Sequence, residues 1–122
     1  MAKTHQPLCI LDEDCPVRQM FDLVGDRWTS SVLFVIGEEV KRYSDLQRQI
    51  PGVSKKMLTQ TLRKLECVGL VHRKVYAVVP PKTEYKLTSL GKSILESISV
   101  LAEWAVEHQK ELRGIQAKSD ME

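Results

Sequence analysis

Apolar residues between positions 54 and 69 recur with the period of an α-helix. Leu58, Leu62 and Leu65 fall on one narrow face at about 100° per residue. Ser54 is a suitable N-cap, and Gly69 suits the position just beyond a helix C-terminus. The opposite face is polar and carries Lys55, Lys56, Thr59, Gln60 and Arg63. The pattern predicts an amphipathic helix over 54–68 with a basic outer face, for which the plain alternative is a solvated surface.

A shorter helical pattern lies directly before it, in residues 43–50. Leu46 and Ile50 share one side, and Ser44 and Gln47 have the spacing of a capping box. A Pro-Gly-Val break follows, and then the basic helix begins. A short helix, a three-residue turn containing Gly and a second helix together indicate a helix-turn-helix, whose second helix enters the major groove of DNA. The predicted DNA-binding residues of that helix are Ser54, Lys55, Lys56, Thr59, Gln60 and Arg63.

Two more helices are predicted before this motif. The first begins at Pro16, where a missing N–H costs nothing, and ends at Gly25 or Asp26. Its apolar face is expected to hold Val17, Met20, Phe21 and Val24. The second covers 27–36 and ends at Gly37, and its residues Trp28, Val32, Leu33, Val35 and Ile36 are too apolar for a surface element. We interpret it as a scaffold behind the motif, with Trp28 in the core rather than stacking on a ligand.

A β-hairpin is predicted after the basic helix. Residues 70–76 and 83–87 are rich in strand-forming residues, and Pro80-Pro81 between them excludes regular structure. A hairpin that directly follows a recognition helix is a wing. Its basic residues are expected to reach phosphates or the minor groove, although a solvated hairpin is the alternative. These residues are Arg73, Lys74 and Lys82.

The last apolar pattern predicts a long helix that begins after Thr88. Its stripe consists of Leu90, Ile94, Ile98, Leu101, Ala105, His108 and Leu112. So broad a face exceeds what one small core covers, so we expect a homodimer through this C-terminal helix. His108 is interpreted as a packed residue rather than a metal ligand.

The fold class expected is therefore mainly α with a small β-hairpin. It is a winged helix-turn-helix domain over 13–112, with the dimerisation helix at about 88–112. Residues 1–12 are expected to be a flexible arm and residues 113–122 a flexible tail.

The overall composition does not identify the partner, but the distribution of charge along the chain does. A length of 122 residues suits one domain, and a net charge of +2 is too small to indicate nucleic acid. Between positions 41 and 74, however, nine Lys or Arg residues stand against Asp45 and Glu66 alone. The basic surplus is thus concentrated around the predicted motif, which favours double-stranded DNA as the partner.

Several other classes of protein are disfavoured. The sequence has no apolar run long enough to span a membrane and no signal-peptide pattern at its start, so a cytoplasmic protein is expected. Its three histidines are scattered, and it has no CxxC motif or glycine-rich phosphate loop. We therefore expect no enzyme, no cofactor and no metal site. The second hypothesis is a winged-helix module that binds protein without sequence-specific DNA binding.

Several short motifs lie along the chain in a characteristic order. They are Cys15-Pro16-Val17, Gly25-Asp26-Arg27-Trp28, the stretches 54–60 and 65–71, and Pro80-Pro81-Lys82-Thr83-Glu84-Tyr85 leading to Leu87-Thr88 and Gly91. Together these motifs resemble the HxlR-type family of MarR-like winged-helix transcription regulators. The resemblance covers about residues 13–108. It implies a homodimeric bacterial or archaeal DNA-binding regulator, and it leaves the operator, the direction of regulation and any small-molecule effector open.

The resemblance also makes Cys15 a redox-sensing candidate, because some members use a cysteine here to sense electrophiles, hypochlorite or disulfide stress. The adjoining helix N-terminus and Arg18 favour a thiolate, whereas the acidic residues 12–14 disfavour one. The alternative is a small capping residue. Cys9 is a candidate resolving partner, and Cys67 is relevant only if it is exposed.

Overall fold

The computed structural model describes residues 14–121, and the side chains of residues 14–115. The predicted arm over 1–12, including Cys9, lies outside the described residues. Within the described part, six helices and a small three-stranded antiparallel sheet confirm the expected fold class. The elements are α1 Pro16–Val24, α2 Arg27–Ile36, β1 Lys41–Arg42, α3 Tyr43–Gln49, α4 Lys55–Cys67, β2 Val71–Tyr76, β3 Lys82–Leu87, α5 Ser89–Glu107 and α6 Gln109–Met121.

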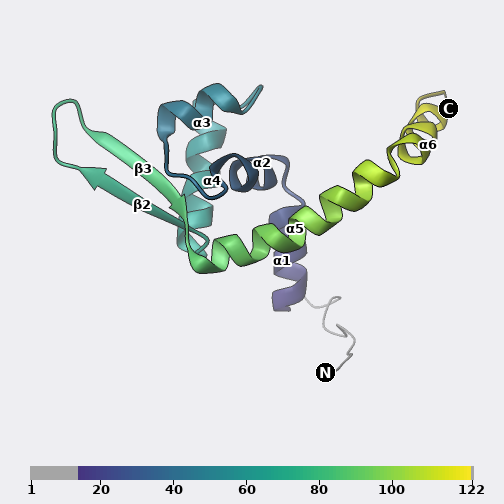
Figure 1. Ribbon diagram of the computed structural model, residues 1–122, viewed down its shortest axis with the longest axis horizontal. Helices are drawn as coiled ribbons and strands as arrows, with labels where there is room; N and C mark the ends of the chain where they lie inside the picture. The colour runs from purple at the N-terminus through teal and green to yellow at the C-terminus, as the bar shows by residue number, and fades with distance from the viewer. Residues whose placement is uncertain (1–13, 122) are drawn as a thin grey trace.

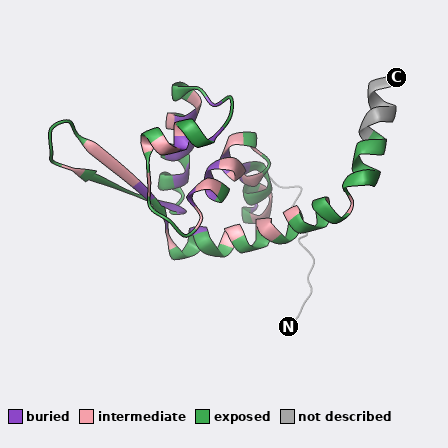
Figure 2. Ribbon diagram, turned by 45° about the horizontal axis from the view of Figure 1, so that its top comes forward, coloured by how far each residue is buried: buried purple, intermediate pink, exposed green. Residues whose placement is uncertain are grey.

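The hydrophobic core forms where α2 packs behind the helix-turn-helix made by α3 and α4. Val32, Leu33 and Ile36 of α2 are completely buried, and the apolar stripe of α4 packs in the same cluster. Figure 2 shows the buried residues gathered in these helices and at the base of the hairpin. Trp28 is only partly buried and packs against the edge of this core. The scaffold role predicted for α2 is thereby confirmed.

Helix α1 buries one residue and leaves part of its apolar face exposed. Its buried residue is Leu23, whereas Met20 and Phe21 are 37% and 57% exposed. Met20 and Phe21 belong to the apolar face expected from the sequence, and in the single chain this part of that face is exposed. The chain therefore presents large apolar side chains of α1 to its surroundings.

Helix α3 is capped differently from the prediction and follows a strand that was not predicted. The backbone N–H of Arg42 donates to Asp45 Oδ2 at 3.1 Å, so the capping interaction begins two residues earlier than the expected Ser44–Gln47 box. The two residues of β1 pair with β3, giving the sheet order β1-β3-β2. A two-residue strand has too few positions for its alternation to be seen in the sequence.

The long C-terminal helix is divided in two at His108. Thr88 caps α5 as predicted, because its Oγ1 accepts the N–H of Gly91 at 3.0 Å. The imidazole of His108 stacks on Trp104, and α6 then continues in a new direction as far as Met121. The single helix expected to reach residue 112 is thus wrong, and the region expected as a flexible tail is largely helical. The hairpin and α6 lie at opposite ends of the molecule (Figure 1).

The start of α5 is fastened to the end of α4. Thr88 Oγ1 donates to the Gly69 carbonyl at 2.6 Å, and the Thr88 N–H donates to the Leu70 carbonyl at 3.0 Å. Gly91 is buried against the same Leu70 carbonyl, so closely that a Cβ there would collide with it. Gly69 itself has a φ of +82°, the left-handed conformation that favours glycine after a helix.

Candidate nucleic-acid interface

Helix α4 is oriented by its cap and by its apolar stripe. The turn before it contains Gly52 with a φ of +83°, and Ser54 Oγ then accepts the Met57 N–H at 3.1 Å. Leu58 and Leu65 are completely buried, which fixes the rotation of the helix about its axis. The predicted residues Ser54, Lys55, Lys56, Gln60 and Arg63 are exposed in this orientation.

Thr59 occupies a different environment from the rest of this predicted set. The hydroxyl of Tyr43 donates to the Lys55 carbonyl at 3.0 Å and lies 3.0 Å from Thr59 Oγ1. Since the tyrosine proton points to the carbonyl, Thr59 is the donor of the second bond. Its hydroxyl therefore links α3 to α4 within the fold. This contact could not be predicted from the sequence pattern, because the two residues are 16 positions apart.

A further contact ties α4 to the scaffold helix. Lys64 Nζ lies 3.2 Å from Asp26 Oδ2, while Asp26 Oδ1 accepts the Trp28 N–H at 2.8 Å as the N-cap of α2. The bond from Trp28 is the main cause of the lowered pKa of Asp26, and Lys64 lowers this pKa further, against a partial desolvation. Asp26 thus holds the start of α2 and one side of the recognition helix together.

The register of the hairpin separates its basic residues onto two faces. Arg73 is paired with Tyr85, and Lys74 with Glu84, so the two basic residues point to opposite sides of the sheet. Arg73 and Tyr85 face α4, where they line a cavity with α4 residues. Lys74 lies on the outer face with Lys82. The three predicted wing residues therefore do not form one continuous surface, because Arg73 lies on the opposite face from Lys74 and Lys82.

On the outer face, both lysines lie over the ring of Tyr76. The Nζ atoms of Lys74 and Lys82 are 4.9 Å and 4.5 Å from the ring centroid, within the range of a cation–π contact. Tyr76 Oη donates to Glu84 at 2.7 Å, and this bond, followed by the charge of Lys82, lowers the pKa of Glu84. The outer face is thus an ordered cluster of basic side chains around one aromatic ring.

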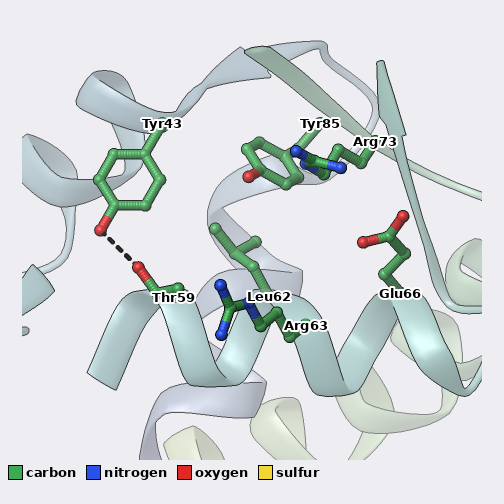
Figure 3. Close-up of a pocket in the computed structure, with 7 residues that line it drawn as sticks. All are labelled: Tyr43, Thr59, Leu62, Arg63, Glu66, Arg73 and Tyr85. Carbon is green, nitrogen blue, oxygen red and sulfur yellow. Dashed lines mark hydrogen bonds between the residues drawn. The ribbon is translucent and has the colours of Figure 1, made fainter. Parts of the chain in front are cut away.

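A cavity of about 330 Å³ lies between α4 and the inner face of the wing, and we call it the α4–wing cavity. Burial raises the pKa of Tyr85, an effect that the charge of the neighbouring Arg73 opposes. Figure 3 shows the lining side chains converging from α3, α4 and the two long strands. They are Tyr43, Thr59, Leu62, Arg63, Glu66, Arg73 and Tyr85. Sequence reasoning identified Thr59, Arg63 and Arg73 but missed the two tyrosines and Glu66, since only the tertiary fold brings them together.

The two cysteines in the described residues differ in their surroundings. Cys15 occupies the N-cap position of α1, is 3% exposed and belongs to a disulfide. Its side chain makes no capping hydrogen bond to α1, which argues against the purely capping interpretation. Cys67 is a free, exposed thiol in the last turn of α4.

Two features are missing from the part of the protein that the structure describes. No helix in this part of the protein is long and apolar enough to cross a membrane. Over the same residues, no group of three His, Cys, Asp or Glu side chains is arranged to hold a metal ion.

Most of the chain matches a known protein family. The match includes the helix-turn-helix, the wing and helix α5. Residues 23–113 match the HxlR-like helix-turn-helix family. The chain belongs to this family. As an HxlR-like protein, it is a DNA-binding transcription regulator of the helix-turn-helix type.

Individual relatives agree with this assignment. The chain is 46% identical over 92 residues to the HTH-type transcriptional regulator YtfH of Escherichia coli K12, covering 75% of this chain and 73% of YtfH. The structure of the putative transcriptional regulator YtfH from Salmonella typhimurium has a TM-score of 0.79 and 36% identity, covering 88% and 96% of the two chains. The structure of the redox regulator HypR in its oxidized form has a TM-score of 0.69 and 36% identity, covering 76% and 96%.

Proposed function

We propose that this HxlR-like protein is a homodimeric regulator that reads a pseudo-palindromic operator through α4. The observation that carries the proposal is the exposed basic face of α4, held outward by its buried leucines and by contacts from Tyr43 and Asp26. A helix in this setting enters the major groove with its N-terminal residues toward the bases.

The exposed side chains suggest distinct roles at the DNA. Gln60 suits a bidentate contact to adenine, and Arg63 suits a guanine edge or a phosphate. Lys55 and Lys56, at the start of the helix, suit phosphates. Thr59 is assigned a smaller part in base reading than the sequence implied, because its hydroxyl is bound to Tyr43.

The wing contributes to the same interface from two faces. Arg73 lies on the face toward α4, so it is placed beside the α4 contacts. Lys74 and Lys82 lie on the outer face and are assigned to phosphates farther along the duplex. Because phosphate contacts release counterions, binding is expected to weaken steeply as the salt concentration rises.

Exposed apolar side chains on α1, α5 and α6 support the homodimer. Leu101 and Val106 of α5 are 63% and 64% exposed, and Ile115 of α6 is 65% exposed. The exposed Met20 and Phe21 of α1 add to this apolar surface. Large exposed apolar areas typically mark protein interfaces, and a two-fold dimer would place two α4 helices in successive major grooves about 34 Å apart.

Cys15 is proposed as the site of a thiol–disulfide switch. It is buried at the first turn of α1 and takes part in a disulfide, while Cys67 is free. The likeness to HypR, which is named a redox regulator, adds support. If Cys15→Ser leaves the release of DNA by diamide unchanged, this part of the proposal is wrong.

The deciding experiment is selection of bound DNA from a random pool, performed with reduced and with oxidised protein. We expect enrichment of a pseudo-palindromic DNA sequence. A winged-helix module that binds protein instead of DNA would enrich no particular sequence. On the selected operator at fixed salt, Arg63→Ala should weaken binding by at least about 1 kcal/mol. Lys92→Ala is the matched control, because Lys92 is an exposed cation on α5 and pairs with the exposed Glu38. Equal affinities for the two variants would contradict the role of Arg63.

A further inference from the structure

The turn that joins β2 to β3 is apolar throughout, and we call it the wing tip (residues 77–81). It consists of Ala77, Val78, Val79, Pro80 and Pro81, and all of them are exposed. Val79 is 99% exposed and Val78 is 51% exposed. Residues at a loop tip are usually small or polar, but no side chain here carries a charge or a hydrogen-bonding group. Contact with water alone therefore does not account for this composition.

The wing tip stands clear of the helices and has a restricted backbone. β2 and β3 have six residues each, so the hairpin extends about 20 Å from its base. The rings of Pro80 and Pro81 fix φ at two positions of the tip, so little conformational freedom remains to be lost when a partner binds. Figure 1 shows the hairpin at the opposite end of the molecule from α6. In a dimer formed through α5 and α6, the two wing tips would therefore lie on the outer flanks of the operator.

Basic side chains surround the wing tip. Lys74 and Lys82 lie over the ring of Tyr76 on either side of it, and Arg42 lines one groove together with Lys82 and the tip. Glu84 is the only acidic residue between positions 71 and 87, and it lies 3.6 Å from Lys82. A positive excess therefore remains around an apolar point.

This combination matches the minor groove of DNA, which is about 6 Å wide and has phosphates along both rims. Cations around the tip suit the phosphates, and the apolar tip suits the space between them. DNA is favoured over an acidic protein, because the tip continues the surface of Lys74 and Lys82 that is already assigned to phosphates. The tip itself has no part in the contacts proposed so far.

We propose that the wing tip is a wedge that enters the minor groove on the flank of each half-site, with Val79 against a base step. Apolar wedges partly unstack such a step and kink the duplex by about 20–90°. Pyrimidine–purine steps such as TA deform most easily, so Val79 adds a sequence preference at a position that α4 does not touch. The wedge rests on the proposed function, because it acts on DNA that α4 has bound.

The first test is a selection from duplexes in which the DNA outside the half-sites is randomised, with the full-length protein. We expect wild type to enrich a pyrimidine–purine step at a fixed distance from each half-site. Val79→Ser should select the same half-sites and lose the flanking step. Val68→Ser is the matched control, because Val68 is an exposed valine at the end of α4 away from the proposed base contacts. Equal melting temperatures of wild type and Val79→Ser check that the fold is unchanged.

The second test measures affinity by fluorescence anisotropy and DNA bending by energy transfer between dyes at the two ends of the selected operator, at fixed salt. Val79→Ser should weaken binding about fivefold, since it removes apolar area that the groove buries. It should also reduce the bending. Replacing the flanking TA step by AA should weaken binding by wild type and have little effect on Val79→Ser. Val79→Arg should move the flanking preference toward A-tracts, whose narrow minor groove attracts arginine.

The possible failures are distinguishable. Selection of half-sites by wild type without a flanking step would overturn the wedge, leave the proposed function intact and favour a protein partner for the tip. Equal bending by wild type and Val79→Ser, or equal losses in Val79→Ser and Val68→Ser, would also overturn the wedge. Selection of no half-site at all would refute the proposed function, and the wedge with it.

Discussion

Removal of the Asp26 side chain is expected to destabilise the protein by about 2 kcal/mol, the sum of two contacts. The first is the N-cap of α2, where Oδ1 accepts the Trp28 N–H at 2.8 Å. Loss of such a cap on substitution by Ala costs about 1 kcal/mol, within a range of about 0.5–2. The second is the ion pair with Lys64 at 3.2 Å, whose side chains are 44% and 30% exposed. Solvent screening limits a pair of this kind to about 0.2–1 kcal/mol.

Two further variants separate these contributions. Asp26→Asn keeps a side-chain oxygen for the cap but loses the charge, so it should cost about 1 kcal/mol or less. Lys64→Met removes only the ion pair and should cost a similar or smaller amount. A double-mutant cycle of Asp26→Asn with Lys64→Met then measures the coupling between the two side chains.

Urea unfolding followed by circular dichroism is the appropriate assay, with all variants at one protein concentration because a dimer's stability depends on it. With a slope of about 1–3 kcal/mol per molar urea, Asp26→Ala should lower the midpoint by about 1 M. If Asp26→Asn were as destabilising as Asp26→Ala, the charge rather than the cap would dominate. An unchanged midpoint for Asp26→Ala would refute the reasoning altogether.

Three other predictions follow from the structure. Folding lowers the pKa of Asp26 from 3.8, so its negative charge stabilises the fold above that pH. The stability advantage of wild type over Asp26→Asn should therefore fade as the pH falls through and below 3.8. Urea midpoints measured at several pH values check this. Gly91→Ala should unfold the domain or lower its melting temperature severely, because the new Cβ would collide with the Leu70 carbonyl, whereas Gly114→Ala has open space and should be neutral or stabilising; equal melting temperatures would contradict this. Leu101→Glu should shift a dimer toward monomer in sedimentation velocity, since Leu101 is 63% exposed in the single chain; the same charge at Ser93, an exposed position near the start of α5, is the control.

The sequence predicted best those elements whose local signals agree. In α4, the leucine period, the Ser54 cap and the following Gly69 all indicate one helix, and the structure places that helix at Lys55–Cys67. Helix α2 was equally clear because its second half is apolar and the helix is bounded by Asp26 and Gly37. Agreement between capping, periodicity and turn chemistry leaves little for tertiary contacts to change.

Other features depended on contacts between residues far apart in the chain. The apolar arc of Met20 and Phe21 was real, but Leu23 packs inward and leaves that arc exposed. The apolar stripe of the last helix continued past His108, and periodicity carries no information about the change of direction there. The candidate site shows the same limit: its basic residues were visible in the sequence, whereas the separation of Arg73 from Lys74 and Lys82 required the strand register.

The fastening of α5 to the end of α4 has a mechanical consequence for a dimer. Through Thr88 and Gly91, the base of α5 and the C-terminus of α4 move as one body. Any change in the angle at which two α5 helices cross would therefore be converted into a change in the separation of the two α4 helices. In such a dimer, each spacing between operator half-sites would require one particular crossing angle of the α5 helices. An operator with altered spacing would therefore bind only a strained dimer.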